Sequence, residues 1–241
     1  MAKTCMSGEK DRLPTTSPSA DVDAFLADLN RAPAVRPEGG RGRLIFALDA
    51  TASREPTWDR ACRIQGEMFE ATTGLGGLDV KLVFYRGFDE CKASRWFQSA
   101  ADLHRAMRAV SCVGGETQIE RVLSHALAES KNRRVHALVF VGDAMEENAD
   151  RLCKLAGELG LLGTPIFVFH EGSDRVAGAA FKQIAKLSRG AYLSFDAASA
   201  GRLKDLLAAV AVYAAGGYRA LADYSAKKGG DIPLLTAQLR G

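Results

Sequence analysis

Five oxygen-bearing side chains stand in three short segments of the sequence, each next to an expected strand or helix. Asp49, Thr51 and Ser53 follow one apolar run, Thr117 opens an amphipathic segment, and Asp143 follows another apolar run. Two carboxylates and three hydroxyls, without His or Cys, are donors for a hard cation such as Mg²⁺ or Mn²⁺ rather than Zn²⁺. The residue types therefore predict a divalent-cation site, provided that the fold brings the three segments together.

Short apolar runs alternate with amphipathic segments over residues 43–217. The runs are rich in Val, Ile and Phe, and the strongest lack polar alternation, which is typical of parallel strands buried on both faces. They cover residues 44–48, 80–85, 137–141, 166–169 and 191–195. Segments with a helical period cover residues 58–69, 119–127, 152–159, 177–187 and 203–213. Residues 90–98 follow a tight turn and predict an antiparallel edge strand.

This alternation predicts a doubly wound α/β fold, with a mostly parallel sheet flanked by helices and one antiparallel edge strand. In such sheets, ligands bind at the carboxyl ends of the strands, where the strand order reverses. The segments that carry Asp49, Thr117 and Asp143 all lie at that edge in the predicted topology. The fold is therefore expected to bring the five oxygen side chains together.

Asp49-x-Thr51-x-Ser53 after a buried strand, a later Gly-Gly-x-Thr117 and an Asp143 that ends the fourth strand resemble the motifs of von Willebrand factor A (vWA) domains. The resemblance covers residues 43–217 and implies a Rossmann-like vWA fold, of bacterial cytoplasmic type, with a metal-ion-dependent adhesion site. It implies that Thr51 and Ser53 ligate the metal directly and that Thr117 does so directly or through water. Asp49 and Asp143 would bind the metal or its waters. Thr51 replaces the Ser usual in the family but keeps the hydroxyl.

The resemblance also implies a function in protein–protein interaction. Mg²⁺ prefers six oxygen ligands, so these side chains would leave one position that an exposed Asp or Glu of a partner protein can fill. We therefore expect cation-dependent protein binding without catalysis. Glu55, Glu146 and Glu147 lie close to the site in sequence, and we expect solvated acids favoured by helix dipoles. As alternatives, these three acids could repel an acidic partner, hold a second ion, or occupy the open position of the metal themselves.

Helix capping is the competing interpretation of the same residues. Thr117-x-x-Glu120 and Asp143-x-x-Glu146 both match the capping-box pattern. Ser53 or Thr57 could cap the helix that begins near Pro56, and Asp49 could accept hydrogen bonds within its own turn. Capping alone does not readily account for five oxygen-bearing side chains on three loops at one end of the sheet. The metal site therefore remains our hypothesis.

Two other functions compete with metal-dependent binding. A phosphohydrolase of the haloacid dehalogenase type also has an Asp after its first strand, but it needs a second carboxylate where this chain has Thr51. The sequence contains neither a GxxxxGK[ST] loop nor a GxSxG elbow. A vWA scaffold that binds partners without metal is the other alternative. Of the four histidines, only His170 falls near the expected ligand edge, and we expect it to be structural.

Composition and charge argue against nucleic-acid binding and membrane association. The net charge of +3 is too small to indicate nucleic acid or an anionic membrane as partner. The longest apolar run, residues 206–215, is about half the roughly 20 residues of a spanning helix. Five scattered cysteines indicate reduced thiols and a cytoplasmic location. We expect a mostly flexible segment at 1–42 with a short helix near 21–30, the vWA-like domain at 43–217, and a peripheral segment at 218–241.

Overall fold

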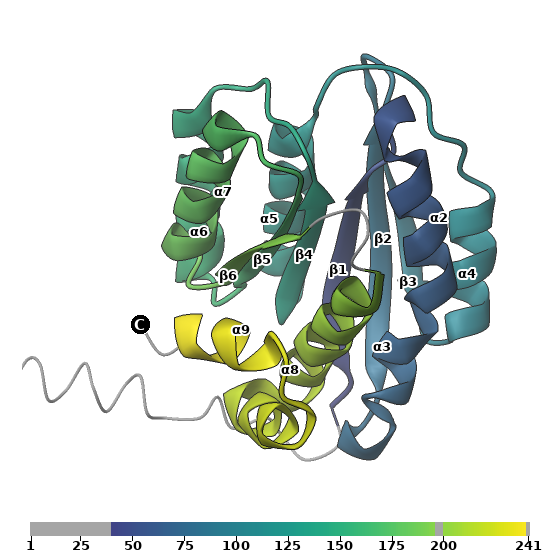
Figure 1. The fold of residues 1–241 in the computed structure, drawn as a ribbon, viewed down its shortest axis with the longest axis vertical. Helices are drawn as coiled ribbons and strands as arrows, with labels where there is room; N and C mark the ends of the chain where they lie inside the picture. Colours follow the sequence, from purple (N-terminus) through teal and green to yellow (C-terminus); the bar gives the residue numbers. More distant parts are fainter. Residues whose placement is uncertain (1–39, 196–199, 240–241) are drawn as a thin grey trace, which may run out of the picture. The chain divides into compact units, whose positions relative to one another are not determined.

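The computed structural model describes residues 40–195 and 200–239 (Figure 1). The chain divides after Pro33 into two units, and the second, Ala34–Gly241, holds all the described residues. The expected helix near 21–30, with almost all of segment 1–42, lies outside them. No helix in the described part of the chain is long and apolar enough to cross a membrane.

A six-stranded sheet forms the centre of this unit, in the order β3-β2-β1-β4-β5-β6. Its strands are β1 (Gly42–Asp49), β2 (Leu78–Arg86), β3 (Glu90–Phe97), β4 (Ala137–Gly142), β5 (Ile166–Glu171) and β6 (Ala191–Phe195). All neighbours pair in parallel except β2 and β3. The prediction of a mostly parallel, doubly wound sheet with one antiparallel edge strand is confirmed.

Helices cover both faces of the sheet (Figure 1). One face carries α2 (Glu55–Ile64), α3 (Gly66–Glu70), α4 (Ala100–Arg108), α8 (Ala200–Lys228) and α9 (Ile232–Gln238). The other face carries α5 (Ile119–Asn132), α6 (Ala149–Leu161) and α7 (Arg175–Leu187). Two 3₁₀ turns, η1 (Ala52–Arg54) and η2 (Thr73–Leu75), complete the described elements.

Strand β1 shows why the apolar runs lack polar alternation. Successive side chains of a strand point to opposite faces. Leu44, Phe46 and Leu48 pack into the core below α2 and α8, whereas Ile45 and Ala47 pack into the core below α5 and α6. Because each fully buried Leu, Ile or Phe side chain contributes about 1.5–3 kcal/mol, both faces must be apolar for the sheet to form.

Two regions differ from the expected pattern. Helix α4 was not expected; it is short, with nine residues, and only Leu103 and Met107 are buried on it. Its N-terminus is capped by Ser99, whose hydroxyl accepts a hydrogen bond from the Asp102 amide at 3.2 Å.

The chain beyond residue 217 is less peripheral than the sequence suggests. The helical path breaks at Gly217, where φ is +76°, and then resumes as far as Lys228. Leu221, Ile232 and Leu235 are all buried in the core on the α8 side of the sheet. These three apolar residues, two of them in the Ile-Pro-Leu-Leu stretch of α9, anchor the C-terminal segment.

Candidate metal site

Strands β1 and β4 are neighbours at the point where the strand order reverses, so the loops after them meet there. Asp49 is the last residue of β1, and Asp143 directly follows β4. The loop before α5 contacts both: the Val113 amide donates to Ala50 O at 3.0 Å, and the Thr117 amide donates to Glu146 Oε2, in the loop after β4, at 2.8 Å. The three loops predicted from the sequence therefore lie at one edge of the sheet.

Gly115 permits this close approach. A Cβ atom at position 115 would lie 2.0 Å from the Gly87 carbonyl oxygen, closer than any real contact. Gly115 thus has a steric role, because it lets the loop before α5 lie against the turn between β2 and β3.

The loop after β1 holds three of the predicted ligands in one turn. The Asp49 carboxylate accepts a hydrogen bond from the Thr51 amide at 2.7 Å, and Thr51 Oγ1 lies 3.5 Å from Ser53 Oγ. The Ser53 side chain is exposed, whereas Asp49 and Thr51 are buried. Asp49 does accept within its own turn, as the capping alternative predicted. Ser53 and Thr57 do not cap α2, whose N-cap is Arg54 with no side-chain hydrogen bond.

Asp49 is a buried carboxylate without a cationic partner among the described residues; only 3% of its surface is exposed. Burial raises its pKa above the ordinary value, and the nearby Asp143 charge raises it further, while the Thr51 hydrogen bonds lower it. Uncompensated burial of a carboxylate is unfavourable, so a cation at this position would stabilise the charged form.

Tyr85 completes the surroundings of Asp49. It faces Asp49 across β1 and β2 and is fully buried. Its hydroxyl interacts with the Asp49 carboxylate but makes no hydrogen bond of normal geometry to any described residue. Burial, together with the charges of Asp49, Glu147 and Asp143, raises its pKa well above the ordinary value. A buried hydroxyl beside the Asp49 carboxylate, without a well-formed hydrogen bond, fits a site that takes a cation with its bound water.

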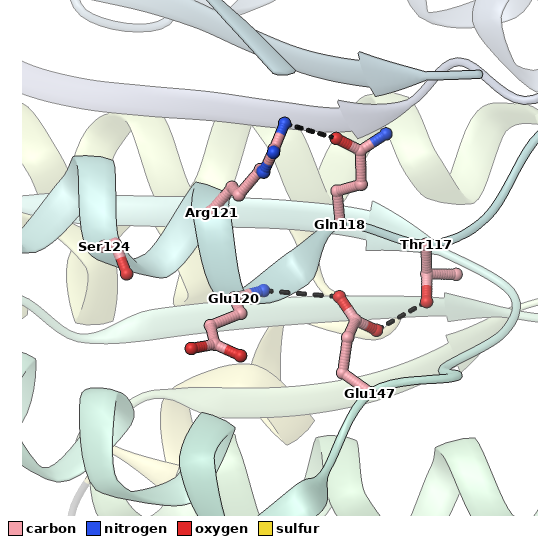
Figure 2. Close-up of a pocket in the computed structure, with 6 residues that line it drawn as sticks. All are labelled: Thr117, Gln118, Glu120, Arg121, Ser124 and Glu147. Atoms are coloured by element: carbon pink, nitrogen blue, oxygen red, sulfur yellow. Dashed lines mark hydrogen bonds between the residues drawn. The ribbon is translucent and has the colours of Figure 1, made fainter. Parts of the chain in front are cut away.

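Thr117 is held by the loop after β4 (Figure 2). Its hydroxyl donates to a Glu147 oxygen and accepts from the Glu146 amide at 2.9 Å, while its own amide donates to Glu146 Oε2 at 2.8 Å. The other Glu147 oxygen accepts from the amides of Ile119 and Glu120. Glu147 therefore caps the N-terminus of α5, where a negative charge is favoured by the helix dipole.

These contacts correct several expectations about the acids. The capping boxes of Thr117 and Asp143 do not form, because the N-caps of α5 and α6 are Gln118 and Asn148. Glu146 and Glu147 are not simply solvated acids at the start of their own helix, since both bind the Thr117 loop. Only Glu55, exposed in the first turn of α2, fits that description.

Arg54 is a site residue that the sequence analysis missed. It is 5% exposed and reaches two carboxylates: Nη1 lies 3.3 Å from Asp143 Oδ2, and Nη2 donates to Glu171. Thr57 Oγ1 also donates to Glu171, which is itself buried at the end of β5. The available signal was the position of this arginine, immediately after the Asp-x-Thr-x-Ser motif.

His170 has the structural role that was expected. Its Nδ1 lies 2.8 Å from the Tyr192 hydroxyl, and its Nε2 lies 3.2 Å from the Asp143 carbonyl oxygen. Burial lowers its pKa, which favours the neutral ring. Through the second contact, His170 holds the backbone of Asp143 at the edge of the sheet.

A shallow cavity of about 350 Å³ adjoins the Thr117 loop (Figure 2). It is lined by Thr117, Gln118, Glu120, Arg121, Ser124 and Glu147.

Over residues 40–195 and 200–239, no three His, Cys, Asp or Glu side chains are grouped to hold a metal by themselves. A cation between the loops after β1 and β4 would therefore depend on the hydroxyls of Thr51, Ser53 and Thr117 in addition to Asp49 and Asp143. These oxygens suit Mg²⁺ or Mn²⁺.

Comparison with known proteins identifies the fold as vWA-like. No protein-family profile matches the sequence, and no curated protein matches it significantly. Among solved structures, proximal thread matrix protein 1 from the mussel byssus, with a zinc-occupied MIDAS motif, superposes with a TM-score of 0.59 at 16% identity. The match covers 72% of this chain and 46% of that chain, so this chain corresponds to less than half of the mussel protein.

Two single-domain structures match over nearly their whole length. The SpRpn10 VWA domain has a TM-score of 0.54 at 13% identity, covering 69% of this chain and 95% of that domain. The vWF domain of the type V pilus tip protein Mfa5 from Porphyromonas gingivalis has a TM-score of 0.56 at 10% identity, covering 72% and 96%. At these identities the likeness establishes the vWA-like α/β fold.

Proposed function

We propose that this chain is a vWA-like domain that binds a divalent cation, Mg²⁺ or Mn²⁺, and recognises a protein partner through it. The observation that carries the proposal is the buried, unpaired Asp49 carboxylate beside Asp143, at the edge where β1 and β4 meet. Opposite charge is the most direct way to stabilise such a pair of acids. The zinc-occupied MIDAS motif of the mussel protein supports a cation at this edge of the fold.

The proposed ligands are Asp49, Thr51, Ser53, Thr117 and Asp143. Thr51 and Ser53 would supply hydroxyl oxygens, and Asp49 and Asp143 would hold the metal or its waters. Thr117 is engaged with Glu146 and Glu147 in this structure, so its hydroxyl would reach the metal only after leaving Glu147 or through a water. The cation would supply the charge that attracts an exposed Asp or Glu of the partner.

Mn²⁺ binding measured by electron paramagnetic resonance tests the proposal. Wild-type protein is expected to bind Mn²⁺, and Asp49→Ala combined with Asp143→Ala is expected to abolish binding. Mn²⁺ binding that persists in the double variant, or no binding by wild type at millimolar Mn²⁺, would contradict the assigned site. At a Mn²⁺ concentration of ten times Kd, linkage predicts a stabilisation of about 1.4 kcal/mol in wild type only.

A metal-independent scaffold is the second candidate, and the Arg54–Asp143 ion pair favours it. That guanidinium already gives Asp143 a positive neighbour without any metal. The two candidates differ in the response to a chelator. Metal-dependent recognition requires that EDTA abolishes binding of a partner with an exposed Asp or Glu, whereas scaffold binding is indifferent to EDTA.

We propose that the domain has no catalytic activity of its own. In support, Thr51 stands where a phosphohydrolase of the haloacid dehalogenase type requires its second carboxylate. Turnover of a generic phosphate ester that Asp49→Ala abolishes would overturn this view. We also propose a bacterial cytoplasmic location, with the free thiols of Cys62, Cys91, Cys112 and Cys153 in support; cell fractionation tests it.

A further inference from the structure

Arg54 carries a positive charge that cannot leave the candidate metal site. Its guanidinium is buried, and its Nη2 is held by Glu171, which is 6% exposed and also accepts from Thr57. A surface arginine could swing into solvent when a metal arrives. Here the anchor is itself buried, so the guanidinium stays where it is.

The other arm of this guanidinium lies on a proposed metal ligand. Arg54 Nη1 is 3.3 Å from Asp143 Oδ2. A cation that binds Asp143 must therefore share that carboxylate with Arg54 and lie within a few ångströms of a fixed positive charge. Like charges this close repel each other even with strong solvent screening.

We propose that Arg54 is a built-in counter-cation that sets the metal affinity of the site. It neutralises part of the Asp143 charge, holds that side chain in place when no metal is bound, and weakens cation binding. This inference rests on the proposed function, because it concerns the affinity of the same site. Its consequence is that the acidic side chain of a partner contributes a large share of the total binding free energy of the cation.

Mn²⁺ titrations of three single variants test the proposal. Arg54→Met removes the charge, Arg54→Lys keeps a positive charge, and Arg41→Met removes a similar charge from the opposite edge of the sheet. Arg41 pairs with Asp79 at 2.6 Å, just before β1 begins, and the eight residues of β1 separate it from Asp49 by about 25 Å. Arg41→Met therefore reports the effect of net charge alone.

We expect Arg54→Met to bind Mn²⁺ about tenfold more tightly than wild type. Arg54→Lys is expected to lie between the two, and Arg41→Met is expected to stay within about twofold of wild type. Unchanged or weaker Mn²⁺ binding by folded Arg54→Met would overturn the proposal, as would equal tightening in Arg41→Met.

Arg54→Met leaves Glu171 buried without its cation and can fail to fold, so a second variant is needed. Arg54→Met with Glu171→Gln removes both charges and is expected to shift Mn²⁺ affinity in the same direction by a smaller factor. No Mn²⁺ binding by wild type or by any variant would overturn both this inference and the proposed function. Mn²⁺ binding by wild type that is not tightened in Arg54→Met would overturn the inference alone.

Discussion

Charged side chains are buried both where the strands begin (the amino edge of the sheet) and where the parallel strands end (the carboxyl edge). The charges are neutralised to different degrees at the two edges. At the amino edge, Glu129 accepts from Lys81 Nζ at 2.6 Å, Trp96 Nε1 at 3.2 Å and Arg43 Nη2 at 3.3 Å. The Arg43 guanidinium also lies 3.9 Å from the centre of the Trp96 ring. At the carboxyl edge, Asp49 has only neutral donors, and the Tyr85 hydroxyl has no well-formed hydrogen bond.

This difference separates a structural charge cluster from a candidate binding site. Buried charge that serves the fold is paired within the chain, because unpaired charge in the interior is costly. Buried charge left without a partner is retained where something from outside supplies one. Replacing a carboxylate by an amide at each edge is therefore expected to change stability in opposite directions.

The largest effect is expected for Glu129→Gln at the amino edge. It leaves Arg43 and Lys81 buried without a negative partner, so unfolding free energy is expected to fall by about 3 kcal/mol in chemical denaturation. Glu90→Gln is the control, because Glu90 pairs with Arg86 and Lys92 in an exposed hairpin and its loss is expected to change little. Equal stability of Glu129→Gln and wild type would break the contrast between the two edges.

A smaller effect of opposite sign is expected for Asp49→Asn at the carboxyl edge. The amide oxygen can still accept from the Thr51 amide, while the uncompensated charge is removed. We expect about 1 kcal/mol of added stability in the presence of EDTA, together with loss of Mn²⁺ binding. A destabilised Asp49→Asn protein in EDTA would mean that the Asp49 charge is compensated within the chain.

The smallest effect is expected in the pH dependence of stability. Burial raises the pKa of Glu129, but the hydrogen bond and charge of Lys81 and the Trp96 hydrogen bond outweigh it, so the net pKa is lowered from the ordinary 4.5. A depressed pKa contributes stability above the unfolded-state pKa, and this is lost as pH falls through the folded-state pKa. Wild type should therefore lose stability below about pH 4.5, and Glu129→Gln should lose less. An equal loss of unfolding free energy on acidification in wild type and Glu129→Gln, measured by chemical denaturation, would contradict this assignment.

Local sequence pattern was sufficient for the sheet and the three loops. A strand buried on both faces is an uninterrupted apolar run, so β1, β4 and β5 can be recognised from neighbouring residues alone. Once the topology is inferred, the ends of the strands fix where Asp49 and Asp143 lie. Their metal-ligating role remains a prediction.

Pairings between distant residues could not be predicted in the same way. Arg54 and Glu171 are 117 positions apart, and nothing near either residue indicates that they form a buried ion pair. The contact of Glu147 with Thr117 spans 30 positions and replaces the local capping box that the sequence suggested. In both pairings tertiary contact, rather than local propensity, determines the outcome.

The steric contact at Gly115 also affects how the surface of this protein can change over evolution. Gly115 is exposed, yet any side chain there would collide with the Gly87 carbonyl, whereas its neighbour Gly114 has open space around it. Two adjacent surface glycines thus differ sharply in mutational tolerance. A lineage of this domain can vary position 114 freely but must keep position 115, so solvent exposure alone is a poor guide to which surface positions can diversify.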